Sequence, residues 1–201
     1  MSIPTREQIL AAAARLYAEH GFRGTTTRAV AEAADVNEVT LFRIFGSKEA
    51  LILEAMRTHG VAAEAHALPD VPQDPEAELT AWATQARKTL LAQRSMIIQA
   101  MGDAELNPEM PKCASQGAEA AYDALRAYFV RLRDAGFVPG DADARFAANL
   151  LIAALFHDAM SRPVMTAVFP PAAEAAAVYA RLTLRAVGFE PRARRARHRV
   201  S

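Results

Sequence analysis

The sequence is poor in cysteine: Cys113 is its only one, so no internal disulfide can form. A lone thiol suits a reducing cytoplasm. Long apolar runs are missing too, since none reaches the roughly 18 residues that a membrane-spanning helix needs. Arg6 and Glu7 interrupt any signal-peptide pattern at the N-terminus. We therefore expect a soluble, cytoplasmic protein without a membrane partner.

Net charge is also absent, because 23 basic side chains balance 23 acidic ones. The balance hides an uneven distribution. Residues 192–201 contain five arginines and no acid, which leaves residues 1–191 with a net charge of −5. We expect this basic tail to be disordered and solvated, and a contribution to anion binding is the alternative. Residues 1–60 carry seven bases and seven acids, so nucleic-acid binding there would depend on where the charges lie.

Motifs for catalysis and metal binding are not found. The sequence has no glycine-rich phosphate loop and no G-x-S-x-G nucleophile motif. His59 and His66 are seven residues apart and could share a helix face, but no Glu-x-x-His spacing accompanies them. His157 and Asp158 could add ligands, and Cys113 is interpreted as a bystander thiol. We expect no enzymatic activity, no metal site and no cofactor.

Helix-forming residues fill most of the chain and predict an all-α fold. Alanine, leucine, glutamate and arginine dominate, and no segment alternates apolar and polar residues as a strand does. Thr5 and Gln8 fit a capping box for a first helix that Gly21 should end near residue 20. Asp141 is a candidate N-cap, and Gly136 and Gly188 are candidate C-caps. The further helices are expected over about residues 27–34, 40–45, 48–66, 75–93, 95–104, 113–134, 142–161 and 172–187.

The segment LPDVPQDP, residues 68–75, contains three prolines and separates two predicted domains. Residues 1–66 should form a small domain of short helices, with a helix-turn-helix at about 27–46. Residues 67–191 should form a bundle of about five longer helices, followed by the tail at 192–201.

The short helix ending at Phe45 has the pattern of a DNA-recognition helix. Leu41, Ile44 and Phe45 recur at i, i+3 and i+4, so they share a face that should pack inward. The opposite face then stays outside, and the DNA major groove is wide enough to admit one such helix. Arg43 suits guanine, and Asn37 suits adenine. The predicted DNA-binding residues are Thr26, Thr27, Arg28, Asn37, Glu38, Val39, Thr40, Phe42, Arg43 and Lys48.

Ser47 should cap the next helix, and the start of that helix offers a phosphate site because its first N–H groups are unpaired and Lys48 adds an ammonium in the first turn. The run Thr26-Thr27-Arg28 does the same at the start of the preceding helix. Thr40 can reach a phosphate or a thymine methyl group. The two phosphate sites should therefore lie on either side of the recognition helix.

The segment from Gln8 to Leu51 resembles the DNA-binding domain of the TetR family of bacterial transcriptional regulators. The resemblance rests on Ile9–Ala13 with Gly21-Phe22, on Thr25–Thr27 with Val30-Ala31, on Thr40–Phe42 with Phe45, and on Ser47–Leu51. It implies an all-α homodimer whose C-terminal domain binds a small molecule and thereby changes affinity for a double-stranded DNA operator. It also implies that the helix at 95–104 moves when that molecule binds.

Four positions depart from the family pattern. Asp35 replaces the usual turn glycine, and aspartate tolerates the left-handed conformation better than most residues do. Val39 stands where a small residue is common. Phe42 and Ile44 replace a common tyrosine and a frequent histidine, so two phosphate contacts should be lost.

The C-terminal part is less informative. Most of its methionines and aromatic residues should be ordinary core, but some could line an apolar ligand pocket. The candidates are Trp82, Met96, Met101, Phe129, Phe146 and Phe156. We expect the helices at about 142–161 and 172–187 to form the dimer face, with intrachain core as the alternative. The candidate dimer-interface residues are Leu150, Ala154, His157, Val178 and Leu182.

These patterns favour a ligand-responsive DNA-binding transcriptional regulator. We interpret it as a repressor that a small, largely apolar molecule releases from a palindromic operator. The alternative is a helical-bundle metal-binding protein or enzyme whose helix-turn-helix is vestigial.

Overall fold

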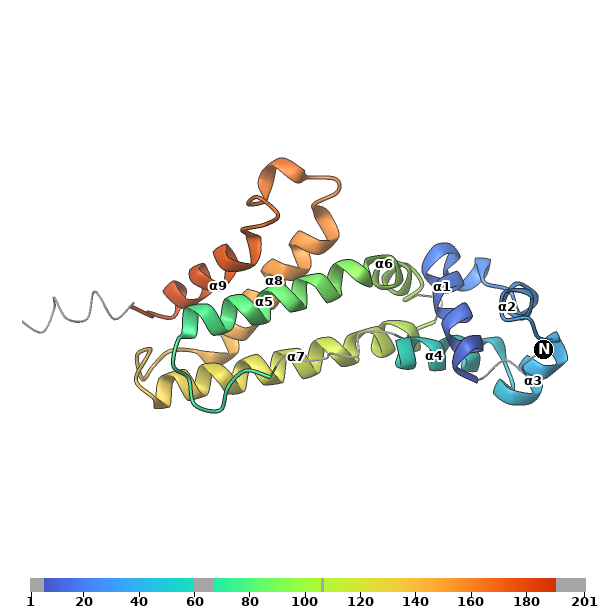
Figure 1. The fold of residues 1–201 in the computed structure, drawn as a ribbon, viewed down its shortest axis with the longest axis horizontal. Coiled ribbons are helices and arrows are strands. Elements are labelled where there is room, and N and C mark those ends of the chain that lie inside the picture. The colour runs from blue at the N-terminus through green and yellow to red at the C-terminus, as the bar shows by residue number, and fades with distance from the viewer. Residues whose placement is uncertain (1–5, 60–66, 106, 191–201) are drawn as a thin grey trace, which may run out of the picture. The chain divides into compact units, whose positions relative to one another are not determined.

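The computed structural model describes residues 6–59, 67–105 and 107–190. These residues form nine α-helices and one short 3-10 helix, and no strand occurs among them (Figure 1). The predicted all-α fold is therefore confirmed. No helix within the described ranges is both long enough and apolar enough to span a membrane. Thr5, His66 and the basic tail lie outside the described residues.

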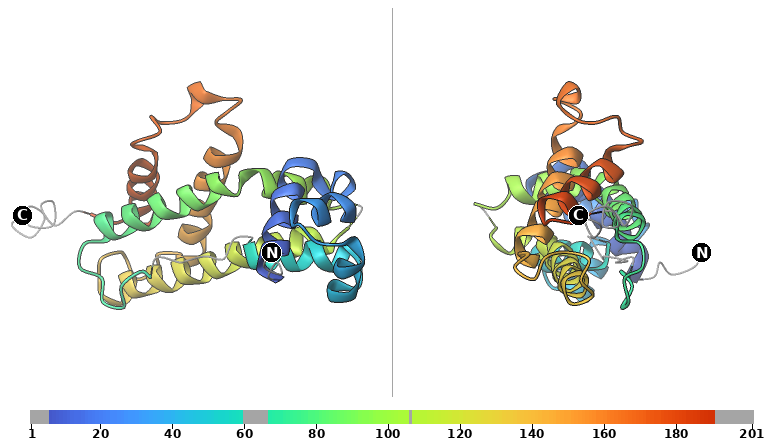
Figure 2. Two further views of the ribbon diagram at one scale, coloured as in Figure 1. Left: turned by 45° about the vertical axis from the view of Figure 1, so that its right-hand side comes forward. Right: turned by 90° about the vertical axis from the view of Figure 1, so that its left-hand side faces the viewer.

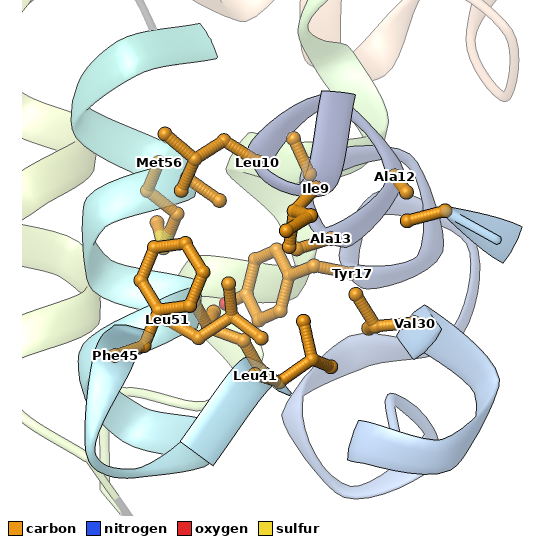
Figure 3. Close-up of a cluster of buried hydrophobic side chains, with 14 of the residues drawn as sticks. Ile9, Leu10, Ala12, Ala13, Tyr17, Val30, Leu41, Phe45, Leu51 and Met56 are labelled. Atoms are coloured by element: carbon orange, nitrogen blue, oxygen red, sulfur yellow. The ribbon is translucent and has the colours of Figure 1, made fainter. Parts of the chain in front are cut away.

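The described chain divides into two compact units, and the first combines residues 1–63 with residues 92–119. It contains α1 (Arg6–Gly24), α2 (Thr27–Ala33), α3 (Glu38–Phe45), α4 (Lys48–His59), α6 (Arg94–Gly102) and the beginning of α7 (Glu109–Asp134). Helix α1 lies at the centre, because it packs against α2, α4 and α6. Its alanine-rich stripe lets the neighbouring helices approach closely, and Tyr17 is completely buried among them (Figure 3).

The second unit combines residues 64–91 with residues 120–201. It contains α5 (Pro75–Ala92), the remainder of α7, α8 (Ala144–Ser161), the 3-10 helix η1 (Thr166–Val168) and α9 (Ala175–Ala186). Helices α8 and α9 pack against each other and are joined through η1 (Figure 2). The buried core includes Trp82, Phe129 and Leu151. The Arg131 guanidinium donates to the Pro69 carbonyl at 3.1 Å and so holds the proline-rich segment onto α7.

Most predicted helix boundaries agree with the structure to within a few residues, but two differ for clear reasons. Helix α7 begins at Glu109 rather than 113, which places Pro111 in the first turn. Proline is tolerated there, since the first N–H groups of a helix have no intrahelical partner. The N-cap of α8 is Asp143 rather than Asp141, and its Oδ1 accepts from the backbone N–H groups of Arg145 and Phe146 at 2.9 and 3.0 Å.

The compact units do not follow chain order, because residues 92–119 group with the N-terminal helices. The division into compact units shows which residues pack together, and it does not show which residues bind DNA or a ligand. The predicted functional division at residues 66 and 67 therefore stays a prediction.

Candidate nucleic-acid interface

Side-chain caps and one left-handed residue define the helix-turn-helix. The Thr26 side chain caps α2 by accepting from Ala29 N–H at 3.1 Å. Asp35 has a φ of +54°, and it is the only non-glycine described residue with positive φ. Its place in the turn confirms the expectation that aspartate takes the role of the usual glycine. Asn37 then caps α3, with its Oδ1 accepting from Val39 N–H at 2.8 Å.

The inner face of α3 is anchored in the core, as predicted. Leu41 is 1% exposed and Phe45 is 8% exposed, and Ile44 is half-buried against the same cluster. Figure 3 shows Leu41 and Phe45 pointing toward Tyr17 and Leu51. A helix of eight residues with two such anchors cannot rotate without pulling large apolar groups into water.

The outer face of α3 carries Val39, Phe42 and Arg43, which are spaced i, i+3 and i+4. The Val39 side chain is 72% exposed and that of Phe42 is 49% exposed. Arg43 is also exposed and forms no ion pair with any described residue. This face is thus open to solvent.

Internal bonds hold other predicted DNA-binding side chains. The Thr27 hydroxyl donates to the Glu38 carboxylate, which joins α2 to α3. Arg28 donates to Glu32 one turn further on at 2.9 Å, and both side chains are exposed. While Asn37 caps α3, it can offer only its Nδ2 donors. A two-point contact with adenine, which also needs Oδ1, is therefore not available in this conformation.

The start of α4 has the predicted cap. Ser47 Oγ accepts from Ala50 N–H at 3.1 Å. Lys48 Nζ lies 4.3 Å from the centroid of the Phe22 ring, so a cation–π contact orients the ammonium. Three N–H donors of that ammonium can still meet phosphate oxygens. The phosphate role of Lys48 stays a prediction.

A polar contact that the sequence does not reveal joins α6 to the break in α1. Helix α1 is interrupted at Gly21, where φ is +67°. Asp103, at the end of α6, accepts there from Phe22 N–H at 3.0 Å and from the Tyr17 hydroxyl at 3.1 Å. Burial and then the Asp103 charge raise the pKa of Tyr17. A Cβ at Gly21 would lie 2.7 Å from Oε1 of Gln99, so the α6 side chains closely cover this break.

Residues 9–55 match the family model described as bacterial regulatory proteins of the tetR family. A solved structure has the same fold over nearly the whole chain. Salmonella enterica GusR superposes with a TM-score of 0.70 over 92% of this chain and 95% of its own, at 24% sequence identity. Residues 9–55 are thus similar to the TetR family, and the chain as a whole has the fold of GusR.

Two curated relatives are similar to this chain over short stretches. The uncharacterised HTH-type regulator YvkB of Bacillus subtilis is 43% identical over 56 residues, 28% of this chain and 30% of that protein. The HTH-type transcriptional repressor AcnR of Corynebacterium efficiens is 40% identical over 55 residues, 27% of this chain and 29% of that protein. The matches thus span less than a third of either relative. They provide no direct guide to the effector.

The six predicted pocket residues do not belong to one buried cluster. Met96 belongs to the buried core of the first unit, and Trp82 and Phe129 belong to that of the second. Phe156 is half-buried. The side chains of Met101 and Phe146 are 59% and 53% exposed. In the single chain, therefore, these two do not line an enclosed cavity.

The predicted dimer residues all retain exposed surface. Leu182 is 53% exposed and His157 is exposed, and His157 stacks edge-on against Phe169 with ring centroids 5.1 Å apart. Leu150, Ala154 and Val178 are half-buried. Four other small and apolar residues of α8 belong to the buried core of the second unit, namely Ala147, Ala148, Leu151 and Leu155.

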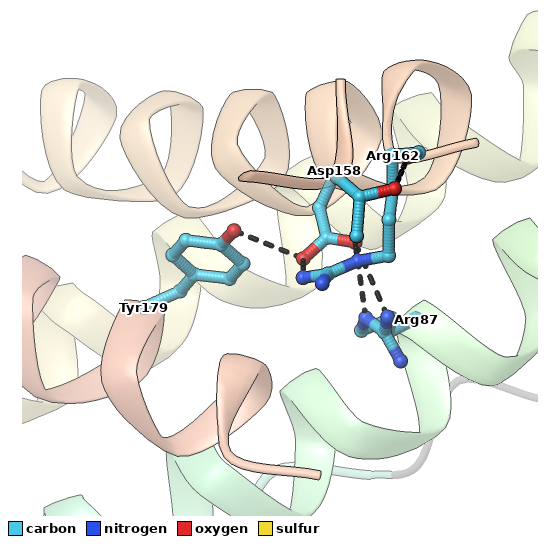
Figure 4. Close-up of polar contacts among 5 residues, drawn as sticks. Arg87, Asp158, Arg162 and Tyr179 are labelled. Carbon is cyan, nitrogen blue, oxygen red and sulfur yellow. Dashed lines mark hydrogen bonds and ion pairs between the residues drawn. The ribbon is translucent and has the colours of Figure 1, made fainter. Parts of the chain in front are cut away.

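Asp158 lies at the centre of a buried polar cluster in the second unit (Figure 4). Its carboxylate is 0% exposed and accepts from Arg162 at 2.8 and 2.6 Å, from Arg87 at 3.2 and 3.4 Å, and from the Tyr179 hydroxyl at 2.9 Å. Burial opposes its ionisation, but the bonds from Arg162, Tyr179 and Arg87 outweigh burial and hold the pKa of Asp158 below its usual value. Burial and the bond to Asp158 raise the pKa of Tyr179 to about 12.

This cluster ties α5, α8 and α9 together. Its carboxylate faces two guanidinium groups, which do not bind metals. Within the described ranges, no group of three or more His, Cys, Asp and Glu side chains could hold a metal ion.

Proposed function

We propose that this chain is a transcriptional regulator that binds a palindromic DNA operator as a homodimer. The observation that supports this proposal best is the way in which α3 is held in the fold. Two buried residues and a side-chain cap hold the helix, and Val39, Phe42 and Arg43 are left on its outer face. Two such helices related by a two-fold axis would enter successive major grooves, about 34 Å apart.

Capped helix starts beside α3 support backbone binding. The N-terminus of α4 combines a Ser47 cap with the Lys48 ammonium, and unpaired N–H groups there favour an anion. Because residues 1–60 have no net positive charge, a few such contacts must supply the phosphate affinity.

We further propose that the protein is a repressor released by a small, largely apolar molecule, as the family resemblance implies. Asp103 supports a route for this signal. It bonds the end of α6 to the α1 backbone, so a shift of α6 would pull on the centre of the DNA-binding helices. A ligand that prefers the shifted state 100-fold would change the equilibrium by about 2.7 kcal/mol, which suffices for a switch.

Selection of bound fragments from random duplex DNA tests the proposal. We expect an enriched inverted repeat whose affinity falls steeply with salt concentration. Binding that is weak, salt-dependent and without sequence preference would contradict it. Once an operator is known, small apolar molecules can be screened for its release, and sedimentation of the free protein reports the dimer.

A further inference from the structure

The outer face of α3 is apolar at two adjacent positions. Val39 and Phe42 lie three residues apart, with side chains 72% and 49% exposed. Residues at this spacing are neighbours on a helix surface and form one continuous patch. Solitary exposed apolar residues are ordinary, but paired ones at the most prominent position of a binding helix favour contact with an apolar group of the partner.

Two polar neighbours at the start of α3 are already engaged within the protein, and a third, Thr40, is half-buried. Asn37 uses its Oδ1 to cap the helix, and Glu38 accepts from the Thr27 hydroxyl. Cytosine is read by a carboxylate that accepts from its amino group, and adenine by a two-point amide contact. Both modes would need these internal bonds to break. Val39, Phe42 and Arg43 remain as the side chains that are exposed and not bonded to a described residue.

The apolar group that base pairs present in the major groove is the C5 methyl of thymine. We propose that Val39 and Phe42 contact thymine methyl groups and thereby select thymine at defined operator positions. The inference rests on the proposed function and adds the base class that this chain prefers. Arg43 lies beside the patch at i+4 from Val39 and supplies charge complementary to DNA, which favours DNA over an apolar protein surface as the occupant.

Replacing thymine by uracil removes the methyl group and leaves every hydrogen-bonding atom of the base pair in place. A set of operator duplexes would be synthesised, and in each duplex one thymine position would carry deoxyuridine in both half-sites. The affinity of the protein would then be measured for each duplex. We expect at least one position at which the wild-type protein binds about fourfold more weakly per methyl removed, the equivalent of about 0.8 kcal/mol.

Variants identify the side chain responsible. Val39→Ala and Phe42→Ala should each bind the natural operator more weakly and lose the response to uracil at their own position. Val71→Ala is a matched control, because Val71 is also 72% exposed and lies in the second unit. It should keep the full wild-type response. Circular dichroism and thermal unfolding show whether each variant is folded.

Two results would overturn the inference and leave the proposed function standing: affinity for an enriched operator that uracil never changes, or an unaltered uracil response in both variants. The second result would assign the methyl effect to DNA shape or to another side chain. Self-association of the wild-type protein that Val39→Ala abolishes would assign the face to a second copy instead. If selection enriches no sequence, the proposed function fails, and the inference fails with it.

Discussion

Replacing Asp158 by asparagine should strongly destabilise the second unit. The carboxylate is fully buried and balances Arg87 and Arg162, whose side chains are only 13% and 15% exposed. Asparagine has nearly the same size, so packing is preserved. It removes the negative charge, however, and its amide N–H groups would face guanidinium donors.

Breaking a buried ion pair by removing one partner costs about 3–5 kcal/mol, because the other charge is left unpaired. We expect the lower end, about 3 kcal/mol, since both arginines keep some access to water. For a chain of this size that corresponds to a decrease in melting temperature of roughly 6–12 °C.

Trp82 provides the assay. It is the only tryptophan, and it is 4% exposed in the core of the unit that contains Asp158. Its fluorescence during urea unfolding therefore reports this unit directly. Asp141→Asn is the matched control, because Asp141 is exposed and undergoes the same change in charge. A loss below about 1 kcal/mol for Asp158→Asn, or an equal loss for the control, would refute the reasoning.

The pH dependence has a definite sign. The folded pKa of Asp158 lies below its ordinary value of 3.8, so the folded state favours the ionised form. This stability is fully present well above pH 3.8 and is lost as the pH falls through the lower folded pKa. The difference between wild type and Asp158→Asn should be constant above about pH 5 and should shrink in acid. A difference that grows in acid would contradict the assigned pKa direction.

Three further predictions concern DNA binding, the α1 break and the dimer. Arg43→Ala should relax base preference at one operator position by about 1–3 kcal/mol, whereas Lys48→Ala should weaken all sequences alike and reduce the salt slope by about one unit; equal loss of discrimination from both would contradict these roles. Gly21→Ala should cost more than Gly46→Ala in thermal unfolding, because both have positive φ but only the Cβ at position 21 meets another side chain; equal costs would show that α6 yields freely. Leu182→Glu should shift sedimentation from dimer to monomer, and an unchanged dimer would place the interface elsewhere.

Local patterns predicted the DNA-binding helices well, because their signals lie within a few residues. The Ser47 cap and the left-handed Asp35 were found where sequence reasoning placed them, and Thr26 is the residue of the run Thr25–Thr27 that caps α2. The spacing of Leu41 and Phe45 identified the buried face of α3 for the same reason. The Asn37 cap was harder to foresee, because the same side chain suits adenine and a helix start equally well.

Contacts between distant residues could not be predicted in this way. Asp103 is 81 residues from Phe22, and Asp158 is 71 residues from Arg87. No periodicity or motif relates such positions, and a charged residue within a helical pattern ordinarily indicates a solvated face. The pocket candidates illustrate the same limit: Met101 and Phe146 are exposed in the single chain although their residue types suggested burial.

The sequence by itself therefore determined the helices, the turn that joins α2 to α3 and the face of α3 that remains outside, since these depend on caps and on 3.6-residue periodicity. Tertiary structure alone decided that α6 is bonded to α1 through Asp103, that Asp158 of α8 is paired with Arg87 of α5, and that Glu38 of α3 is bonded to Thr27 of α2. Each of these depends on which helices pack together. That choice is made by the summed burial of many side chains, and no short stretch of residues encodes it.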